Sequence, residues 1–187
     1  MTRRGLILSV YLPSLLLSFA SGLLIPTLPL YVHSMGASFE VVSVVVAMAG
    51  LGTLLADVPA GLLMSKLGRR PAMIVGAATL VVTALGLGAS GFIGGLIFFR
   101  LLSGMGSSLW SISRHTFLAE EVTPRERGRA IAMFGGVNRI GTFAGPAVGG
   151  FVAARYGLAA PFFVYAGVAL AATIVAFLFV PEGRAHL

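Results

Sequence analysis

Cysteine is absent from the 187 residues, and charged side chains make up only 10% of them. Without cysteine the chain has no disulfide, no thiol nucleophile and no zinc finger. Soluble domains carry about 25% charged residues, because a folded chain in water needs polar groups on its surface. The three histidines, His33, His115 and His186, lie in unrelated places, and no nucleophile stands with a base or a set of metal ligands. These absences exclude a water-soluble fold and indicate neither an enzyme nor a metal site.

Apolar residues account for 57% of the chain and fall into long runs. A helix needs about 20 apolar residues to cross the roughly 30 Å hydrocarbon core of a bilayer. By that criterion six transmembrane helices are predicted, near residues 5–32, 41–64, 71–89, 94–118, 130–154 and 159–180. Glycine and proline inside such runs are tolerated in membrane helices, where small residues let backbones pack closely. The predicted helices 71–89 and 159–180 contain no charged residue, so we expect them to face lipid.

The net charge of +7 comes from basic residues dispersed in short loops instead of gathered on one amphipathic face. This distribution speaks against nucleic acid as a partner and fits the positive-inside rule. One side of the membrane receives nearly all of them: Arg3, Arg4, Lys66, Arg69, Arg70, Arg125, Arg127, Arg129 and Arg184. The opposite side has only Arg155. We therefore predict a multi-pass protein with both termini in the cytoplasm, and the arginine-rich, lysine-poor composition suggests the plasma membrane of a prokaryote.

Shifting the chain against itself by 89 residues aligns small and polar residues without a gap. The aligned pairs include Ser14 with Ser103, Ser18 with Ser107, Gly52 with Gly141, Gly61 with Gly150, Lys66 with Arg155 and Gly68 with Gly157. We interpret residues 1–89 and 90–187 as two repeat units of three helices each. Because three is odd, the second unit crosses the membrane in the opposite sense, which makes an inverted 3+3 repeat. Such repeats build transporter halves that bind substrate near the bilayer midplane.

Two charged residues lie deep inside the predicted helices and indicate a functional site in the interior of the protein. Asp57 and Arg139 each lie about eight or nine residues from a cytoplasmic helix end, so both sit roughly 12 to 14 Å from the inner face. Charges at that depth are costly and usually pair with one another or line a water-filled path. We hypothesise that Asp57 is the titrating carboxylate of proton coupling, with Arg139 or Arg114 as its partner. A static structural ion pair is the alternative.

A polar stripe runs along the predicted helix 94–118. Its members recur every three or four residues and therefore share one helical face: Arg100, Ser103, Ser107, Ser111 and Arg114. Such a face turns toward a cavity. Arg100, about 9 Å from the outer helix end, has the alternative of snorkelling to the interface. Further candidates for lining the cavity are Ser14, Ser18 and Asn138.

The segment GLLMSKLGRRP, residues 61–71, resembles the signature loop of the major facilitator superfamily in the place where that family has it. The positions that carry the resemblance are Gly61, Ser65, Lys66, Gly68, Arg69 and Arg70. Ser65 stands where the family normally has an aspartate that helps latch the second helix against the carboxyl-terminal half. A basic cytoplasmic turn would explain the charges but not their spacing.

The segment GTFAGPAVGG, residues 141–150, resembles the antiporter motif of the drug and proton exchangers in this superfamily. Its positions are Gly141, Gly145, Pro146, Gly149 and Gly150, with Ala132 where the motif's distant first glycine is usual. Close packing of helices is the alternative explanation of the glycines. Arg100, followed by Gly104 and Gly106, is similar to the superfamily's fourth-helix motif, whose arginine is linked with proton transfer.

The resemblance implies that residues 1–187 form the amino-terminal six-helix half of such a transporter. The implied function is proton-coupled efflux of small amphipathic molecules or drugs, with the proton gradient as energy source and no cofactor. Alternatives are a proton- or sodium-coupled uptake symporter, and a transport-inactive half that acts as an interaction protein. The polar faces of a lone half would meet lipid. Besides lipid and a small-molecule substrate, we therefore expect a missing carboxyl-terminal six-helix half or a second copy as partner.

Overall fold

The computed structural model describes residues 7–123 and 125–181, and all regular structure in this part of the chain is helical. A π-helical turn, η1 (Ile7–Tyr11), leads into long helices: α2 (Leu12–Ser34), α3 (Phe39–Leu67), α4 (Arg69–Ala89), α5 (Ile93–Glu121), α6 (Arg127–Tyr156) and α7 (Ala160–Phe179). Each predicted helix corresponds to one of these, and the all-α six-helix fold class is confirmed. Several helices extend past the predicted bounds, because a helix continues through polar residues that lie outside the hydrocarbon layer.

Within the described residues, five helices are long and apolar enough to cross a membrane, namely α2 with η1, α3, α4, α5 and α7. Helix α6 has 30 residues, which at 1.5 Å per residue is ample length. Its arginines, its glycines and Asn138 make it less apolar than the others. The stability of α6 in a bilayer therefore depends on the neighbouring helix α2, which packs along it.

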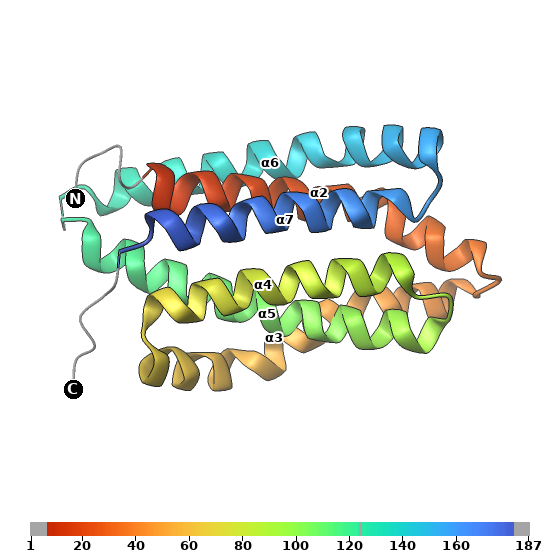
Figure 1. The fold of residues 1–187 in the computed structure, drawn as a ribbon, viewed down its shortest axis with the longest axis horizontal. Helices are drawn as coiled ribbons and strands as arrows, with labels where there is room; N and C mark the ends of the chain where they lie inside the picture. Colours follow the sequence, from red (N-terminus) through yellow and green to blue (C-terminus); the bar gives the residue numbers. More distant parts are fainter. Residues whose placement is uncertain (1–6, 124, 182–187) are drawn as a thin grey trace.

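The connections between helices gather at the two ends of an elongated bundle (Figure 1). One end holds the start of α2, the α3–α4 and α5–α6 connections and the end of α7. The other end holds the α2–α3, α4–α5 and α6–α7 connections. The first end carries the basic residues Lys66, Arg69, Arg70, Arg125, Arg127 and Arg129, whereas Arg155 lies at the second. The described basic loop residues are thus concentrated at one end.

Helix packing follows a twofold pattern. Helix α2 packs along α6 as α5 packs along α3, and α7 packs on α2 as α4 packs on α5. Helices α4 and α7 contact each other. Exchanging α2, α3 and α4 for α5, α6 and α7 converts this set of contacts into itself, as a pair of three-helix repeats requires. The twofold pattern agrees with a division of the chain between residues 89 and 90, and that division stays a prediction.

The middle helix of each three-helix unit ends in the same way. Gly68 closes α3 with φ 86° and ψ 161°, and its N–H donates to the Met64 carbonyl at 2.9 Å. Gly157 closes α6 with φ 95° and ψ 159°, and its N–H donates to the Ala153 carbonyl at 2.9 Å. Only glycine adopts this backbone conformation without strain. These two equivalent turns lie at positions that the 89-residue shift aligns.

The core lies mainly where α2, α4, α5 and α7 meet. Its largest fully buried side chains include Leu23, Met73, Leu87, Leu96, Phe117 and Phe162. The outer faces of α3 and α6 instead expose large apolar groups, among them Leu54, Val58, Phe143 and Phe151. Apolar surface of that extent is stable against lipid or another protein but not in water. The bundle is therefore built for a membrane.

Candidate functional site

A cavity of about 390 Å³ lies between α2, α3 and α5, with one lining residue each from α4 and α7. Its wall is largely apolar. The polar side chains that line it are Ser21, Thr53, Arg100, Ser103, Ser107 and Tyr165. A mostly apolar wall with a few converging polar groups is the usual make-up of a small-molecule site.

Arg100 supplies the charge of this cavity. Its Nη2 donates to the Val46 carbonyl on α3 at 3.4 Å, and its Nε is buried with no acceptor. Arg100 as a whole is half-buried, and its guanidinium turns toward α3 and the cavity. None of the described residues that line the cavity is an aspartate or a glutamate. The cavity is consequently positive, and its low-dielectric wall strengthens attraction to an anion.

Glycines bring α3 and α5 together at the wall of the cavity. A Cβ atom on Gly52 would overlap the Leu101 carbonyl, and one on Gly104 would overlap the Ala49 carbonyl. Thr53 Oγ1 donates across the same contact to the Gly104 carbonyl at 3.2 Å and within its own helix to the Ala49 carbonyl at 3.0 Å. Backbone contact between two helices leaves little freedom of movement, so this wall is rigid.

The predicted polar stripe of α5 divides into two parts. Arg100, Ser103 and Ser107 line the cavity, and Ser103 Oγ donates to the Arg100 carbonyl at 2.8 Å. Ser111 and Arg114 lie further along the helix, away from these lining residues, where Arg114 Nη2 donates to Ser111 Oγ at 3.4 Å. The helical period places all five on one face, but the cavity reaches only the first three.

Asp57 on α3 bonds to a hydroxyl group. Ser108 Oγ on α5 donates to Asp57 Oδ1 at 2.5 Å, and the Asp57 side chain is exposed on the outside of the lone bundle. Among the described residues Asp57 forms no ion pair with Arg139 or Arg114. The hypothesised pairing is therefore not observed here: Arg139 belongs to the α2–α6 pair, and Arg114 lies over the Phe134 ring of α6.

The remaining polar candidates lie along α2 and α6. Arg139 is exposed beside a wide hollow on the outer face of α6, which Asn138 also lines. Asn138 Oδ1 accepts a short hydrogen bond from Ser18 Oγ of α2. Ser14 is fully buried, and its hydroxyl has no hydrogen-bond partner among the described residues. Ser14, Ser18, Asn138 and Arg139 are not among the residues that line the cavity at Arg100.

The glycines of the antiporter-like segment press α6 onto α2. A Cβ on Gly141 would lie 2.8 Å from the Leu15 carbonyl oxygen, and one on Gly145 would lie 2.5 Å from Gly22 Cα. A Cβ on Gly149 would lie 2.5 Å from the Leu23 carbonyl oxygen, whereas one on Gly150 would meet open space. Pro146 borders the same contact, with its Cδ 3.3 Å from a Cβ built on Gly22. Three of the four glycines thus have a packing role, and a role in antiport stays a prediction.

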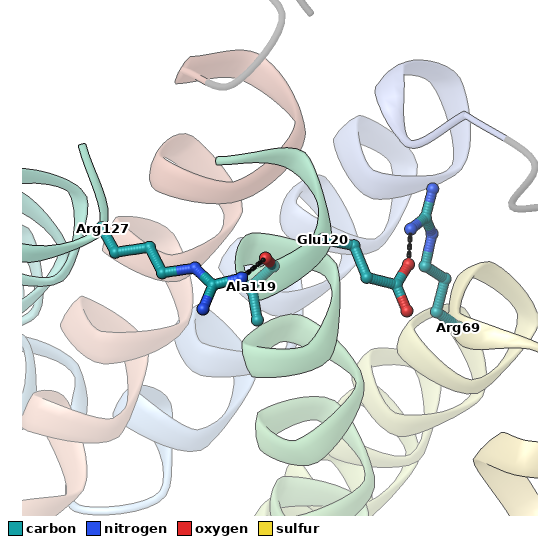
Figure 2. Close-up of polar contacts among 4 residues, drawn as sticks. All are labelled: Arg69, Ala119, Glu120 and Arg127. Atoms are coloured by element: carbon teal, nitrogen blue, oxygen red, sulfur yellow. Dashed lines mark hydrogen bonds and ion pairs between the residues drawn. The ribbon is translucent and has the colours of Figure 1, made fainter. Parts of the chain in front are cut away.

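Arg69, from the loop segment 61–71, contacts the last turn of α5 (Figure 2). Arg69 Nη1 donates to Glu120 Oε2 in a short ion pair, and its guanidinium lies 4.8 Å from the centroid of the Phe117 ring. Arg127 Nη2, from the start of α6, donates to the Ala119 carbonyl at 3.1 Å. The loops on both sides of α5's last turn therefore hold that turn in place.

The other loop positions have different surroundings. Arg70 Nη2 donates to the Phe177 carbonyl of α7 at 2.9 Å. Ser65 Oγ, at the position of the family's aspartate, donates to the Leu62 carbonyl of its own helix at 2.8 Å. Lys66 is exposed, and a Cβ on Gly61 would meet nothing within 4 Å. Nothing within the described residues engages the Ser65 side chain from another helix, so the latch that the aspartate would provide has no counterpart here.

Sequence reasoning did not assign Thr53, Ser108 or Tyr165 to the site. Tyr165 comes from α7, a helix without charged residues that we expected to face lipid. Its position in the cavity wall shows that this expectation is wrong for that face of α7. Ser108 lies next to Ser107 of the stripe, but hydroxyl groups are so common in this chain that the pairing with Asp57 has no signal in the sequence.

A six-helix membrane bundle whose helices pack in a twofold pattern is typical of transporter halves. The profile of the Major Facilitator Superfamily matches residues 10–186. The chain therefore belongs to this superfamily of multi-pass membrane transporters.

Several curated relatives are named for resistance or export. The chain is 32% identical over 129 residues to the tetracenomycin C resistance and export protein of Streptomyces glaucescens, covering 69% of this chain and 24% of that protein. It is 26% identical over 161 residues to multidrug resistance protein 2 of Bacillus subtilis, covering 86% of this chain and 40% of that protein. It is 28% identical over 165 residues to the multi-drug resistance efflux pump PmrA of Streptococcus pneumoniae, covering 86% of this chain and 41% of that protein. The chain thus spans less than half the length of these relatives.

A solved structure has the same fold. The peptide transporter POT in complex with sulfate superposes with a TM-score of 0.84 at 17% identity, covering 94% of this chain and 37% of that one. At this low identity the likeness concerns the fold alone.

Proposed function

We propose that this chain is the amino-terminal half of a proton-coupled exporter of small amphipathic molecules in the cell membrane. The observation that carries the proposal is the cavity between α2, α3 and α5. It combines the guanidinium of Arg100 with the hydroxyls of Ser103, Ser107 and Tyr165 in an apolar wall. An amphipathic molecule fits such a wall, because its apolar part replaces lipid contacts while its polar part meets the arginine. The names of the relatives favour export over uptake.

The working unit needs a second half. The outer faces of α3 and α6 carry both exposed apolar residues and the charges of Asp57 and Arg139. A charge that faces lipid is costly, so these faces are suited to a protein partner. Because the chain spans less than half of its relatives, a carboxyl-terminal six-helix half is the partner we propose, and a second copy is the alternative.

Asp57 is our candidate for proton coupling, with the proton gradient as the energy source and no cofactor. Asp57 is the acidic residue that lies well inside a helix, and Ser108 fixes its orientation. Transfer of a proton on and off this carboxylate would change the charge on the face of α3. The basic loops support a cytoplasmic position of both termini by the positive-inside rule.

The test is transport into everted membrane vesicles. The 187-residue chain is expressed alone and joined to the carboxyl-terminal half of the Bacillus subtilis relative. One cationic and one anionic amphipathic dye serve as substrates. The proposal expects accumulation of at least one dye in the energised vesicles that a protonophore abolishes. Movement of dye out of the vesicles under the same gradient would establish uptake as the physiological direction and overturn export.

Two carboxamide variants separate coupling from general damage. Asp57→Asn removes the proposed proton carrier, so gradient-driven accumulation should fall by about tenfold or more, whereas exchange of dye without a gradient continues. Glu40→Gln, at the exposed start of α3 near the opposite end, is the matched control and should transport normally. Unchanged gradient dependence in Asp57→Asn would remove Asp57 from the mechanism.

A further inference from the structure

Arg114 is a buried cation without a counter-ion among the described residues. The residue is 9% exposed, and its guanidinium carbon lies 4.2 Å from the centroid of the Phe134 ring on α6. Its Nη2 contacts Ser111 Oγ at 3.4 Å and His115 Nε2 at 3.3 Å, and its Nε is buried with no acceptor. An aromatic face and a neutral hydroxyl compensate only part of the cost of burying a full charge.

Each carboxylate whose side chain the structure describes is engaged elsewhere or is distant. Asp57 accepts from Ser108, Glu120 pairs with Arg69, Glu126 accepts from Thr123, and Glu40 lies at the opposite end of the bundle. None of them forms an ion pair with Arg114. The anion that would neutralise Arg114 is thus missing from the described part of the chain.

A second buried donor stands one helical turn away. The indole Nε1 of Trp110 is buried and has no acceptor, and Trp110 is 3% exposed. Residues four apart lie on the same helical face. Trp110 and Arg114 therefore lie one turn apart on one side of α5, each with a buried N–H that has no acceptor among the described residues. A carboxylate, which has two acceptor oxygens, is the kind of anion that such donors bind.

Side chains join α5 to α6 at this face. Helix α5 packs mainly along α3 and α4, and α6 packs mainly along α2. The side chains of Arg114 and His115 reach across to the Phe134 ring, with the His115 ring centroid 5.5 Å from it. The titratable groups near the site are His115 on α5 and Tyr11 of η1. The Tyr11 hydroxyl donates to the carbonyl of Ala130, which lies one helical turn before Phe134 on α6.

We infer that Arg114, with Trp110, binds the carboxylate group of an amphipathic organic anion that the transporter moves. This inference rests on the proposed function and narrows its substrates to anions. Arg100 lies on the same stripe of α5, nearer its other end, and makes the cavity there positive as well. A lipophilic cation would find no described carboxylate at either position.

Equilibrium binding to the purified 187-residue chain in phosphatidylcholine nanodiscs tests the inference. Radiolabelled octanoate is the probe, and octyltrimethylammonium, of the same chain length and opposite charge, is the competitor. The inference expects saturable octanoate binding that octyltrimethylammonium does not displace. Trp110, the one tryptophan of the chain, should change its emission in parallel. The assay needs no proton gradient and no second half, so its failure is distinguishable from failure of the proposed transport.

Arginine variants locate the site. Arg114→Gln should weaken octanoate binding by about tenfold or more, the loss expected for a charge-assisted hydrogen bond. Arg114→Lys keeps the charge but not the planar donor pair, so it should bind with intermediate affinity and serves if the glutamine variant loses helix content. Arg155→Gln, an exposed arginine at the far end of α6, is the matched control and should bind as the native chain does.

Three results would overturn the inference. The first is octanoate affinity that Arg114→Gln and Arg114→Lys leave unchanged. The second is equal displacement of octanoate by octyltrimethylammonium, which would mean apolar binding without charge selection. The third is loss of octanoate binding when phosphatidylglycerol replaces part of the phosphatidylcholine, which would assign the site to a lipid headgroup instead of a transported carboxylate.

Discussion

Ser108 on α5 holds Asp57 on α3 through a hydrogen bond of 2.5 Å to its carboxylate, so the acidic residue deep in the membrane is tied to a hydroxyl of a neighbouring helix. Ser108 itself is 1% exposed, whereas Asp57 faces the outside of the bundle. The bond thus positions a carboxylate at the surface where we propose the second half to dock.

Replacing Ser108 by alanine should destabilise the bundle. Hydrogen bonds to charged groups contribute about 1.5 to 3 kcal/mol when buried, and the exposure of Asp57 reduces that to about 1 kcal/mol. Ser43→Ala is the matched control, because Ser43 Oγ is exposed and donates only to the Phe39 carbonyl of its own helix. Its effect should stay within about 0.5 kcal/mol. Denaturant unfolding in detergent, followed by circular dichroism, measures both, and equal effects would show that the Ser108 bond does not join α3 to α5.

Gly68→Ala should cost about 1 to 3 kcal/mol of stability, because an alanine is strained at φ 86° and ψ 161°. Gly157→Ala should cost a similar amount, since its backbone has nearly the same conformation. Gly61→Ala, in the same loop signature, lies within α3 and meets open space, so it should be neutral or stabilising by up to about 1 kcal/mol. Thermal unfolding of the three variants checks the order. A Gly61→Ala variant as unstable as Gly68→Ala would contradict the strain argument.

The fold could be predicted from the sequence because long apolar runs are typical of membrane helices, although α6 is less apolar than the other helices. The helical period also puts Arg100, Ser103 and Ser107 on one face, and in the structure these three residues line the cavity, while their role in transport stays a prediction. The hydrogen-bond partner of Asp57 could not be predicted from the sequence. Depth along a helix can be counted from residue numbers, but the rotation of each helix and its choice of neighbour depend on contacts between distant segments.

Tyr165 illustrates the same limit. Helix α7 has the composition of a lipid-facing segment, and part of its surface is exposed, as at Leu170 and Ile174. Its other face packs on α2 and α4 and brings Tyr165 to the cavity. Uniform apolarity hides which face is buried, because lipid and protein interior both favour apolar side chains. Only a packed structure separates the two faces.

The ion pair of Arg69 with Glu120 should be measurable by a double-mutant cycle. Arg69→Ala and Glu120→Ala remove either partner, and the double variant gives the coupling between them. Because the Glu120 side chain is 52% exposed, the coupling should be about 0.5 to 1 kcal/mol and should fall in high salt. Arg127→Ala, which acts on the neighbouring Ala119 carbonyl, provides a comparison that should not couple to Arg69. A coupling near zero at low salt would show that the pair does not hold the last turn of α5.

Gly145 and Gly150 separate packing from function within the antiporter-like segment. Gly145→Ala places a methyl group 2.5 Å from Gly22 Cα, so α2 and α6 must move apart at a cost of about 1 to 3 kcal/mol. Gly150→Ala meets open space in this half and should be neutral or stabilising by up to about 1 kcal/mol. Unfolding in detergent measures the loss of stability in Gly145→Ala. Transport by the chain joined to a second half measures the activity of Gly150→Ala. If Gly150→Ala is stable but transports poorly, the glycine serves a contact with the second half, whereas normal transport would leave helix packing as the sole role of this segment.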